Sequence, residues 1–491
     1  MNKGKQLLRH LGASLIFAVG LAMGIIPVWA QDTVWAQDTL YLRLDDAIQR
    51  AKEHSVDAAV AKNRLEAAYW TFRTFRAQQL PEMSLRGTLP NYRKNYVSYQ
   101  LEDGSYTFVR NNNVGLSGGL YVTQNIPFTG GTIALSTTLD YNRQMGTNLR
   151  NEFMSVPFAV TLTQPLLAAN TFKWDRKIEP VRYEESQAAY AEEMEEVTLS
   201  TIAYFFNCLL AESNVSIAQQ NLANAEKLYQ IAQAKRTLGK ISESELMQLK
   251  LTALQAKGTL TEAKSNLKAK TFALVAFLGM EDNVTVVPEV PQSIPVRDYA
   301  YQQVLETALT YNSFAKNILR RQLEADYAVA TAKGNQRSID LYASFGYSGV
   351  NSTLAATYGQ LRDNQVVEVG LNIPILDWGK RKGQVKVAES NREVVASQIK
   401  QEEMKFQQEI FLLVEQFNNQ AGQLAISAEA DALAQQRYAM AIETFLVGTL
   451  NILDLNNARD SKDQARQKHI EDLYLYWNYF YNIRSVTAGK M

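Results

Sequence analysis

Few residues in this sequence have the types and spacing that chemistry requires. Three histidines occur, His10, His54 and His469, and none lies at metal-binding or catalytic spacing from a partner. The single cysteine, Cys208, sits in an apolar run, which predicts a buried packing role and excludes an intrachain disulfide. No phosphate-binding loop or nucleophile motif appears. The sequence therefore predicts no catalytic residue, no metal site and no cofactor, and it argues against an enzyme.

Composition narrows the class of protein further. The chain has 491 residues, of which 46% are hydrophobic and 20% are charged, as is ordinary for a folded protein. Fifty basic and fifty acidic residues cancel. A nucleic-acid-binding protein normally carries a basic excess, so the zero net charge argues against that function.

The N-terminus resembles an export signal. A basic stretch precedes an uncharged apolar segment, residues 11–28, and Val28 and Ala30 supply the small residues of a cleavage site. We expect a signal peptide at 1–30. Because the hexapeptide Val-Trp-Ala-Gln-Asp-Thr occurs twice, cleavage after Ala36 is a second candidate, and an uncleaved anchor is the alternative. The only cysteine lies far away, so we expect no lipid anchor through a thiol.

The rest of the chain has no apolar stretch of about 18 residues, which predicts no transmembrane helix. A mature chain that crosses a membrane would then need strands closed into a barrel, since only helices and closed barrels satisfy every backbone polar group in lipid.

The chain is internally duplicated. Gly239 and Gly448 each interrupt a long helix-like tract and lie 209 residues apart. Pro165 and Pro374, which end two alternating segments, have the same separation. Several anchors agree in order and spacing, which indicates two copies of one unit.

The two copies differ by one insertion. Leu-Glu-Ala at 65–67 matches Leu-Glu-Ala at 323–325 at an offset of about 257, so about 48 extra residues fall in the first half, roughly at 101–155. These residues would enlarge the external loops or lengthen strands. The expected organisation is a first repeat at 40–287 (strand block about 83–167, helical hairpin about 174–278), a linker at 288–298, and a second repeat at 299–488 (strand block about 339–376, helical hairpin about 380–486).

Very long helices are expected in both halves. A helix over 175–238 would be roughly 95 Å long, and 384–447 gives nearly the same length. Apolar and small residues follow the alternating four-three spacing of a coiled-coil seam. The seam positions are Ala211, Val215, Ala218, Leu222, Ala225, Tyr229 and Ala232 in the first tract, and Ala421, Ala425, Ala428, Ala432, Gln435, Ala439, Ile442 and Leu446 in the second.

A second helix runs back after each central glycine. Ser242 and Asn451 are expected to cap these helices, with Glu245 completing a capping box. Each half therefore contains a helical hairpin with a glycine at its tip, and the glycine itself reads as a helix C-cap.

The strand blocks alternate apolar and polar residues with period two, as in 133–141, 158–162, 339–347 and 367–373. This pattern fits a membrane barrel and a half-buried soluble sheet alike. Glycines among the strands are expected at turns or bends; they are Gly115, Gly118, Gly119, Gly130 and Gly131. A few strands cannot close a water-filled barrel alone, whereas several subunits sharing one barrel can.

The residues around both glycines resemble the hairpin tips of the TolC family of outer-membrane efflux and secretion channels. Residues 445–455, Phe-Leu-Val-Gly-Thr-Leu-Asn-Ile-Leu-Asp-Leu, are similar to that family's second tip, and 237–246 to its first. The segment 373–379, Ile-Pro-Ile-Leu-Asp-Trp-Gly, is similar to its strand-to-helix junction, which 128–131 partly echoes.

The resemblance covers almost the whole mature chain and implies a mainly α fold with a β-barrel portion. A homotrimer would form an α-helical tunnel in the periplasm and a shared β-barrel in the outer-membrane lipid of a Gram-negative bacterium. The implied function is a passive conduit of a tripartite efflux or type I secretion system that exports small molecules or peptides. Its implied partners are a periplasmic adaptor (membrane fusion) protein and an inner-membrane pump of the RND or ABC type.

The resemblance also implies roles for tip residues. The expected adaptor-docking residues are Leu238, Gly239, Val447, Gly448 and Thr449. Family members carry acids six and nine positions beyond the second glycine, around the periplasmic entrance; here Asp454 and Asn457 stand there. A trimer would thus keep one carboxylate ring, for which the alternative is a solvated helix residue. The family's basic latch residue is Leu450 in this chain.

The alternative function is a periplasmic coiled-coil scaffold or adaptor. Adaptors also use long helical hairpins, but generally one hairpin flanked by small β-domains. Two equivalent hairpins, each with its own strand block, favour the channel.

Overall fold

The computed structural model describes residues 39–145, 149–239, 241–281, 285–291, 297–336, 338–372, 375–447 and 449–491. The expected signal peptide with both cleavage sites, residues 292–296 of the expected linker, Pro374 and Gly448 lie outside these residues.

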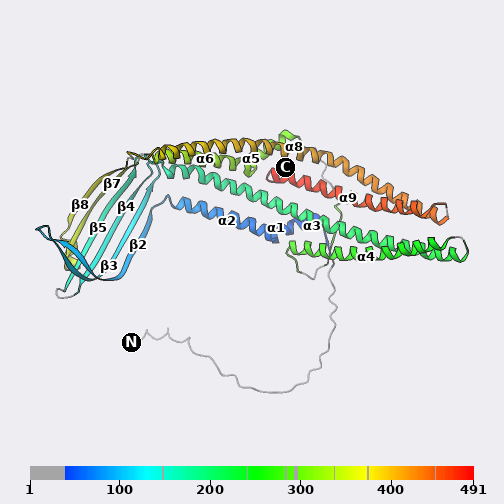
Figure 1. Ribbon diagram of the computed structural model, residues 1–491, viewed down its shortest axis with the longest axis horizontal. Coiled ribbons are helices and arrows are strands. Elements are labelled where there is room, and N and C mark those ends of the chain that lie inside the picture. The colour runs from blue at the N-terminus through cyan, green and yellow to red at the C-terminus, as the bar shows by residue number, and fades with distance from the viewer. Residues whose placement is uncertain are drawn as a thin grey trace, which may run out of the picture. The chain divides into compact units, whose positions relative to one another are not determined.

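The first half begins with a short strand and two helices and continues through four long strands into two long helices (Figure 1). Its elements are β1 (Thr39–Leu42), α1 (Leu44–His54), α2 (Val56–Ala77), β2 (Glu82–Gln100), β3 (Tyr106–Ile126), β4 (Gly131–Gln144), β5 (Arg150–Pro165), α3 (Thr171–Thr237) and α4 (Glu243–Phe277).

The second half repeats this order with two long strands in place of four. Its elements are β6 (Thr285–Pro288), α5 (Tyr301–Tyr311), α6 (Ser313–Gly334), β7 (Ser338–Asn351), α7 (Leu354–Gly359), β8 (Arg362–Asn372), α8 (Lys380–Val447) and α9 (Ile452–Val486).

Helix lengths confirm that the fold is a duplicated unit. Equivalent helices have 11 and 11, 22 and 22, 67 and 68, and 35 and 35 residues. The N-cap of α2 is Ser55, and its counterpart at α6 is Asn312, 257 positions later.

All long strands form one antiparallel sheet of 6 strands in the order β2-β3-β4-β5-β7-β8. The insertion therefore adds two strands to the first half. The first-half strands β2 and β3, with 19 and 21 residues, are also longer than β7 and β8, with 14 and 11. β3 pairs with β2 over most of its length and with β4 from Asn113 to Ile126, so the added hairpin continues the wall. β1 and β6, which precede the short helices of the two halves, pair with each other in parallel. Residues 285–287 of β6 fall inside the expected bounds of the first repeat.

The register confirms that each expected strand has one apolar face. Leu135 lies opposite Val160, and Val160 lies opposite Phe345, all on one side of the sheet. On the other side, the hydroxyls of Thr161 and Ser344 lie 3.4 Å apart. The sheet thus presents one apolar and one polar face.

Three of the five glycines that were expected at turns or bends lie inside a strand: Gly115, Gly118 and Gly119. Gly130 has φ 83° in the turn between β3 and β4, as expected. Gly118 and Gly119 instead lie inside β3, where a Cβ on Gly119 would come within 2.8 Å of the Thr138 side chain. Close approach of the neighbouring strand, rather than a turn, explains this glycine.

The long helices form two hairpins, α3 with α4 and α8 with α9, and α3 packs against α9 across the halves. No helix in the described part of the chain has the length and apolar character needed to span a membrane. The α3 seam is confirmed, since five of its seven positions are buried: Ala211, Val215, Ala218, Ala225 and Ala232.

The expected α8 seam is wrong for the single chain. Its alanines from Ala425 to Ala439 are exposed, whereas Leu424, Ser427, Asp431 and Tyr438 are buried. This buried stripe also has four-three spacing, but it starts one residue earlier. One residue is about 100° of rotation around a helix, so the predicted stripe lies on a different side of α8.

A large apolar core joins the two halves where the short helices pack on the long ones. Phe205 of α3, Leu274 of α4, Val304 of α5, Phe417 of α8 and Tyr476 of α9 are all within it and nearly fully buried. This core fixes the position of the two hairpins relative to each other along the direction of their helices.

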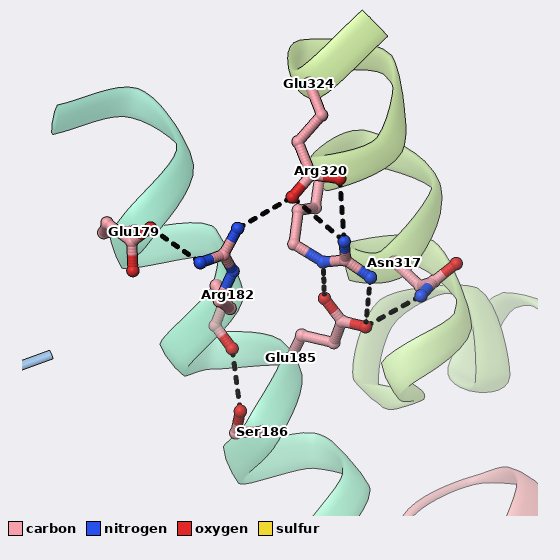
Figure 2. Close-up of polar contacts among 7 residues, drawn as sticks. All are labelled: Glu179, Arg182, Glu185, Ser186, Asn317, Arg320 and Glu324. Atoms are coloured by element: carbon pink, nitrogen blue, oxygen red, sulfur yellow. Dashed lines mark hydrogen bonds and ion pairs between the residues drawn. The ribbon is translucent and has the colours of Figure 1, made fainter. Parts of the chain in front are cut away.

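A charged network also connects the halves, between α3 and α6 (Figure 2). Glu185 of α3 accepts hydrogen bonds from Arg320 and from Asn317 of α6, the latter at 2.8 Å. Arg182 bonds Glu324 at 2.8 Å, and Arg320 bonds the same carboxylate at 2.9 Å. Burial alone would raise the pKa of Glu185, but the bonds from Arg320 and Asn317 outweigh it, so this pKa is lowered.

We expect Glu185→Gln to lower the thermal unfolding midpoint of the purified protein at pH 7, at a cost of about 1–2 kcal/mol. A lowered carboxyl pKa contributes stability above its unfolded value and loses it as pH falls through the folded value. The difference between wild type and variant should therefore shrink below the ordinary pKa of 4.5. Glu184→Gln is the control, because Glu184 pairs with Lys316 while 52% exposed. A difference that stays constant with pH would contradict the assignment.

Candidate functional site

The first hairpin tip (residues 238–242) is a tight, capped turn. Gly239 has φ 69°, the left-handed conformation that glycine adopts without strain, and its N–H donates to the Arg236 carbonyl at 2.9 Å. Ser242 caps α4 in a complete capping box with Glu245, as expected. Leu238 is 71% exposed at the end of α3. The turn is fixed, and its apolar residue faces solvent.

The second tip (residues 448–451) has a different construction. Val447 ends α8 and is 80% exposed. Thr449 donates to the Thr444 carbonyl through both its N–H and its hydroxyl, each at 3.3 Å. Asn451 caps α9 by accepting from the Asp454 N–H at 2.8 Å, which confirms the expected cap. Gly448, the fifth expected docking residue, lies outside the described residues.

A small apolar cluster supports the second tip. Tyr438, Leu455 and Ala458 are buried together, and Leu450 packs against them. Leu450 directly precedes the N-cap of α9 and Leu455 is its fourth helical residue, which is the arrangement of a hydrophobic staple. The position that carries a basic latch residue in the resembled family is here an apolar one that fixes the turn.

The two expected entrance residues lie on one exposed side of α9. Asp454 and Asn457 are both exposed and one helical turn apart, while Leu455 and Ala458 face the cluster. Among the described residues, none forms a hydrogen bond or an ion pair with the Asp454 carboxylate. Asp454 is an acidic residue in the first turn of α9, where the positive end of the helix dipole makes a negative charge stabilising for the helix.

Polar side chains link the two hairpins above the tips. Asn221 of α3 donates to Asp463 of α9 at 2.7 Å, and Asn224 donates to the Tyr438 hydroxyl at 3.2 Å. Nearer the tips, the Lys235 ammonium donates to the Leu446 carbonyl at 3.3 Å. Sequence reasoning missed these contacts. Their one signal is asparagine at seven-residue spacing, Asn214 and Asn221, in an alanine-rich helix.

Charges lie close to these links. The Lys462 ammonium is 4.8 Å from the centre of the Tyr438 ring, and Arg466 bonds Asp431 at 3.0 Å. Burial raises the pKa of the Tyr438 hydroxyl. Burial also lowers the pKa of His469, with Arg466 adding to the shift, so His469 is neutral near pH 7. A cavity of about 650 Å³ lies between α3, α8 and α9 beside these groups.

Within the described ranges, no group of three or more histidine, cysteine or acidic residues could hold a metal ion. Cys208 is buried beside Thr271, and burial raises its thiol pKa.

One protein family matches both halves of the chain. Residues 132–280 and 305–489 match the family described as outer membrane efflux protein. No curated protein sequence matches the chain.

The fold resembles solved outer-membrane proteins. The Campylobacter jejuni CmeC outer membrane channel has a TM-score of 0.64 at 15% identity, over 91% of this chain and 85% of that one. The Vibrio cholerae outer membrane protein VceC has a TM-score of 0.62 at 15% identity, over 91% and 96%. The open Neisseria gonorrhoeae MtrE outer membrane channel has 0.59 at 14%, over 91% and 89%.

At the first tip, we expect Gly239→Ala to cost about 1 kcal/mol, because an L-residue with a Cβ is strained at positive φ. Amide hydrogen exchange in residues 241–250 should speed up by about fivefold, since that free energy applies to opening of the turn. Gly258→Ala is the matched control. Gly258 lies inside α4 with open space around it, so the same change should slow exchange. Faster exchange in both variants, or in neither, would contradict the role of Gly239.

Proposed function

The chain belongs to the outer membrane efflux protein family, and we propose that it is one subunit of a homotrimeric channel in the outer membrane of a Gram-negative bacterium. The channel is a passive conduit that exports small molecules or peptides in a tripartite efflux or type I secretion system. The observation that carries this proposal is the duplicated unit itself, two long helical hairpins joined to a sheet with one apolar and one polar face.

The exposed stripe of α8 supports assembly with further copies. Its four-three spacing from Ala421 to Leu446 is the pattern of a helix-packing seam, yet its alanines from Ala425 to Ala439 are exposed in the single chain. Small side chains at seam positions permit close approach of another helix. A neighbouring copy would supply that helix, and three copies would enclose a tunnel between their hairpins.

The tips are the proposed contact with a periplasmic adaptor protein. Leu238 and Val447 are large apolar residues at the ends of the two hairpins, and Met247 and Leu453 nearby are 61% and 68% exposed. Exposed apolar residues gathered on fixed turns are typical of a protein-binding surface. The adaptor would link the channel to an inner-membrane pump of the RND or ABC type.

Asp454 is the proposed selectivity residue of the periplasmic entrance. Three copies would bring three carboxylates together, which favours cations over anions at the opening. Asn457, one turn further along α9, adds polar but uncharged lining.

The links between α3 and the second hairpin are the proposed closed-state contacts. Asn221 with Asp463, and Asn224 with Tyr438, hold the hairpins of one subunit together. Adaptor binding would favour the open state by competing with these contacts, because a ligand shifts an equilibrium by its differential affinity for the two states.

A periplasmic scaffold is not favoured as the alternative. The family match covers both halves of the chain, and the long amphipathic strands have no role in a coiled-coil scaffold.

The test of this function is a crosslink at the entrance. Asp454→Cys in a Cys208→Ser background should reduce the preference for cations but still permit efflux. A cleavable maleimide crosslinker should then join copies and abolish efflux until it is cleaved. Lys264→Cys, on the exposed side of α4, is the control that accepts the reagent without closing the entrance. Full efflux with the copies crosslinked would refute the gate. Recovery of the protein in soluble or inner-membrane fractions would refute the channel.

A second experiment opens the gate instead. Asn221→Asp places a carboxylate 2.7 Å from that of Asp463, so repulsion should separate α3 from α9. We expect at least a tenfold higher conductance at rest in planar bilayers, and sensitivity of cells to antibiotics that the closed channel excludes. Gln219→Glu, which adds the same charge on the exposed side of α3, should leave conductance unchanged. Equal conductance in the two variants would contradict the latch.

A further inference from the structure

The added hairpin changes what a ring of copies would look like, if the proposed homotrimer holds. With two strands from each half, a subunit would contribute four strands; this subunit has 6 in one sheet. The edges of that sheet are β2 and β8, which among the described residues have a partner strand on one side only.

The strand directions permit copies to join through these edges. Every neighbouring pair in the sheet is antiparallel, and the number of strands is even, so β2 and β8 run in opposite directions. When the next copy is added with the same orientation, its β2 lies antiparallel to β8 of the first. A closed ring of copies then has no free edge, which is what a membrane requires.

The edge strands have the exposure of strands without a neighbour. Leu85 of β2 and Val367 of β8 are 81% and 77% exposed, whereas Leu135 and Phe345 inside the sheet are 45% and 42% exposed, on the same apolar face. Long, apolar edge strands of this kind pair with another strand.

Charge also favours a second copy as the partner. On the polar face, β2 carries Arg86 near its start and β8 carries Glu368 near its end. These are opposite charges on the two surfaces that would meet.

The added hairpin is part of this wall and not an appendage. The apolar row continues without a break from Met83 through Val122 to Leu135. The turn between β3 and β4 is bound to the helical end of the sheet, where Asn170 donates to the Pro127 carbonyl and Gln164 to the Thr129 carbonyl, each at 2.9 Å.

We propose that β8 of each copy pairs with β2 of the next, so that three copies close one wall of eighteen strands in which β3 and β4 are full members. Since barrel diameter grows roughly in proportion to strand number, this wall is about 1.5 times as wide as one of twelve strands. Such a wall leaves an aqueous channel, with the apolar face toward lipid and the polar face toward water. The narrow point of the conduit then lies at the helical tips.

Cysteine pairs decide which strand meets β8. In a Cys208→Ser background, Glu368→Cys is combined with a cysteine on the polar face of β2, at Ser84, Arg86 or Thr88, because the register across the boundary is set by the ring. The matched pair combines Glu368→Cys with Ser136→Cys of β4, which would be the edge if β2 and β3 lay outside the wall. A short bifunctional crosslinker is applied to membranes, and products are separated on a denaturing gel.

We expect at least one β2–β8 pair to give covalent dimers and trimers, and the β4–β8 pair to give none. Products from β4–β8 alone, products that run as internally linked monomers, or none from any pair would overturn the eighteen-strand wall. The Asp454→Cys crosslink reports separately on the trimer. If that crosslink does not form, the proposed function is refuted. If it forms while no β2–β8 pair gives products, only the eighteen-strand wall is refuted. Imaging of the protein in lipid nanodiscs should then show eighteen strands; twelve would overturn the proposal.

Discussion

The fold depends on the burial of narrow seams along helices of 67 and 68 residues. Such helices cannot collapse into a globular core, so each must find a partner over its whole length. α3 does so within the chain, against α4 and α9, while α8 buries one stripe and leaves its alanine stripe exposed. The apolar core around Phe205 and Phe417 fixes the relative level of the hairpins. This core, together with the bonds between the hairpins nearer the tips, aligns the two tips.

Local features were predictable from sequence because their causes are local. Period-two alternation located β4, β5, β7 and β8, and cap chemistry located the starts of α4 and α9. The number of strands was not predictable, because Gly118 and Gly119 interrupt the pattern of β3. The buried stripe of α8 was predicted wrongly because alanine fits a buried helix seam and an exposed helix surface equally well. At the site, Asp454 could be predicted from the tip motif. The bond from Asn221 to Asp463 could not be predicted, because it joins residues 242 positions apart.

The two tips show how one repeat unit can take two roles. The first tip is held by the capping box of Ser242 and Glu245, by the positive φ of Gly239 and by Arg236, which donates to the Ile241 carbonyl across the turn. The second adds the apolar staple of Leu450 and lies against Tyr438, which also bonds α3. Movement of the second tip would therefore disturb both the Asn224–Tyr438 bond and the bond from Lys235 to the Leu446 carbonyl, whereas movement of the first would disturb only the Lys235 bond. This asymmetry favours the second hairpin as the moving part of the gate.

The unequal repeats also obey a constraint of connectivity. Each half leaves a helix, crosses the sheet and must return to the helical end to begin α3 or α8. Since each strand crosses once, only an even number of strands brings the chain back, and a single added strand would start α3 at the wrong end. The insertion therefore had to be a hairpin with its turn near the start of α3, where Asn170 binds the Pro127 carbonyl and also caps the helix. The sheet can widen by pairs of strands while the helices remain unchanged. The width of the wall can therefore change without any change in the residues of the tips.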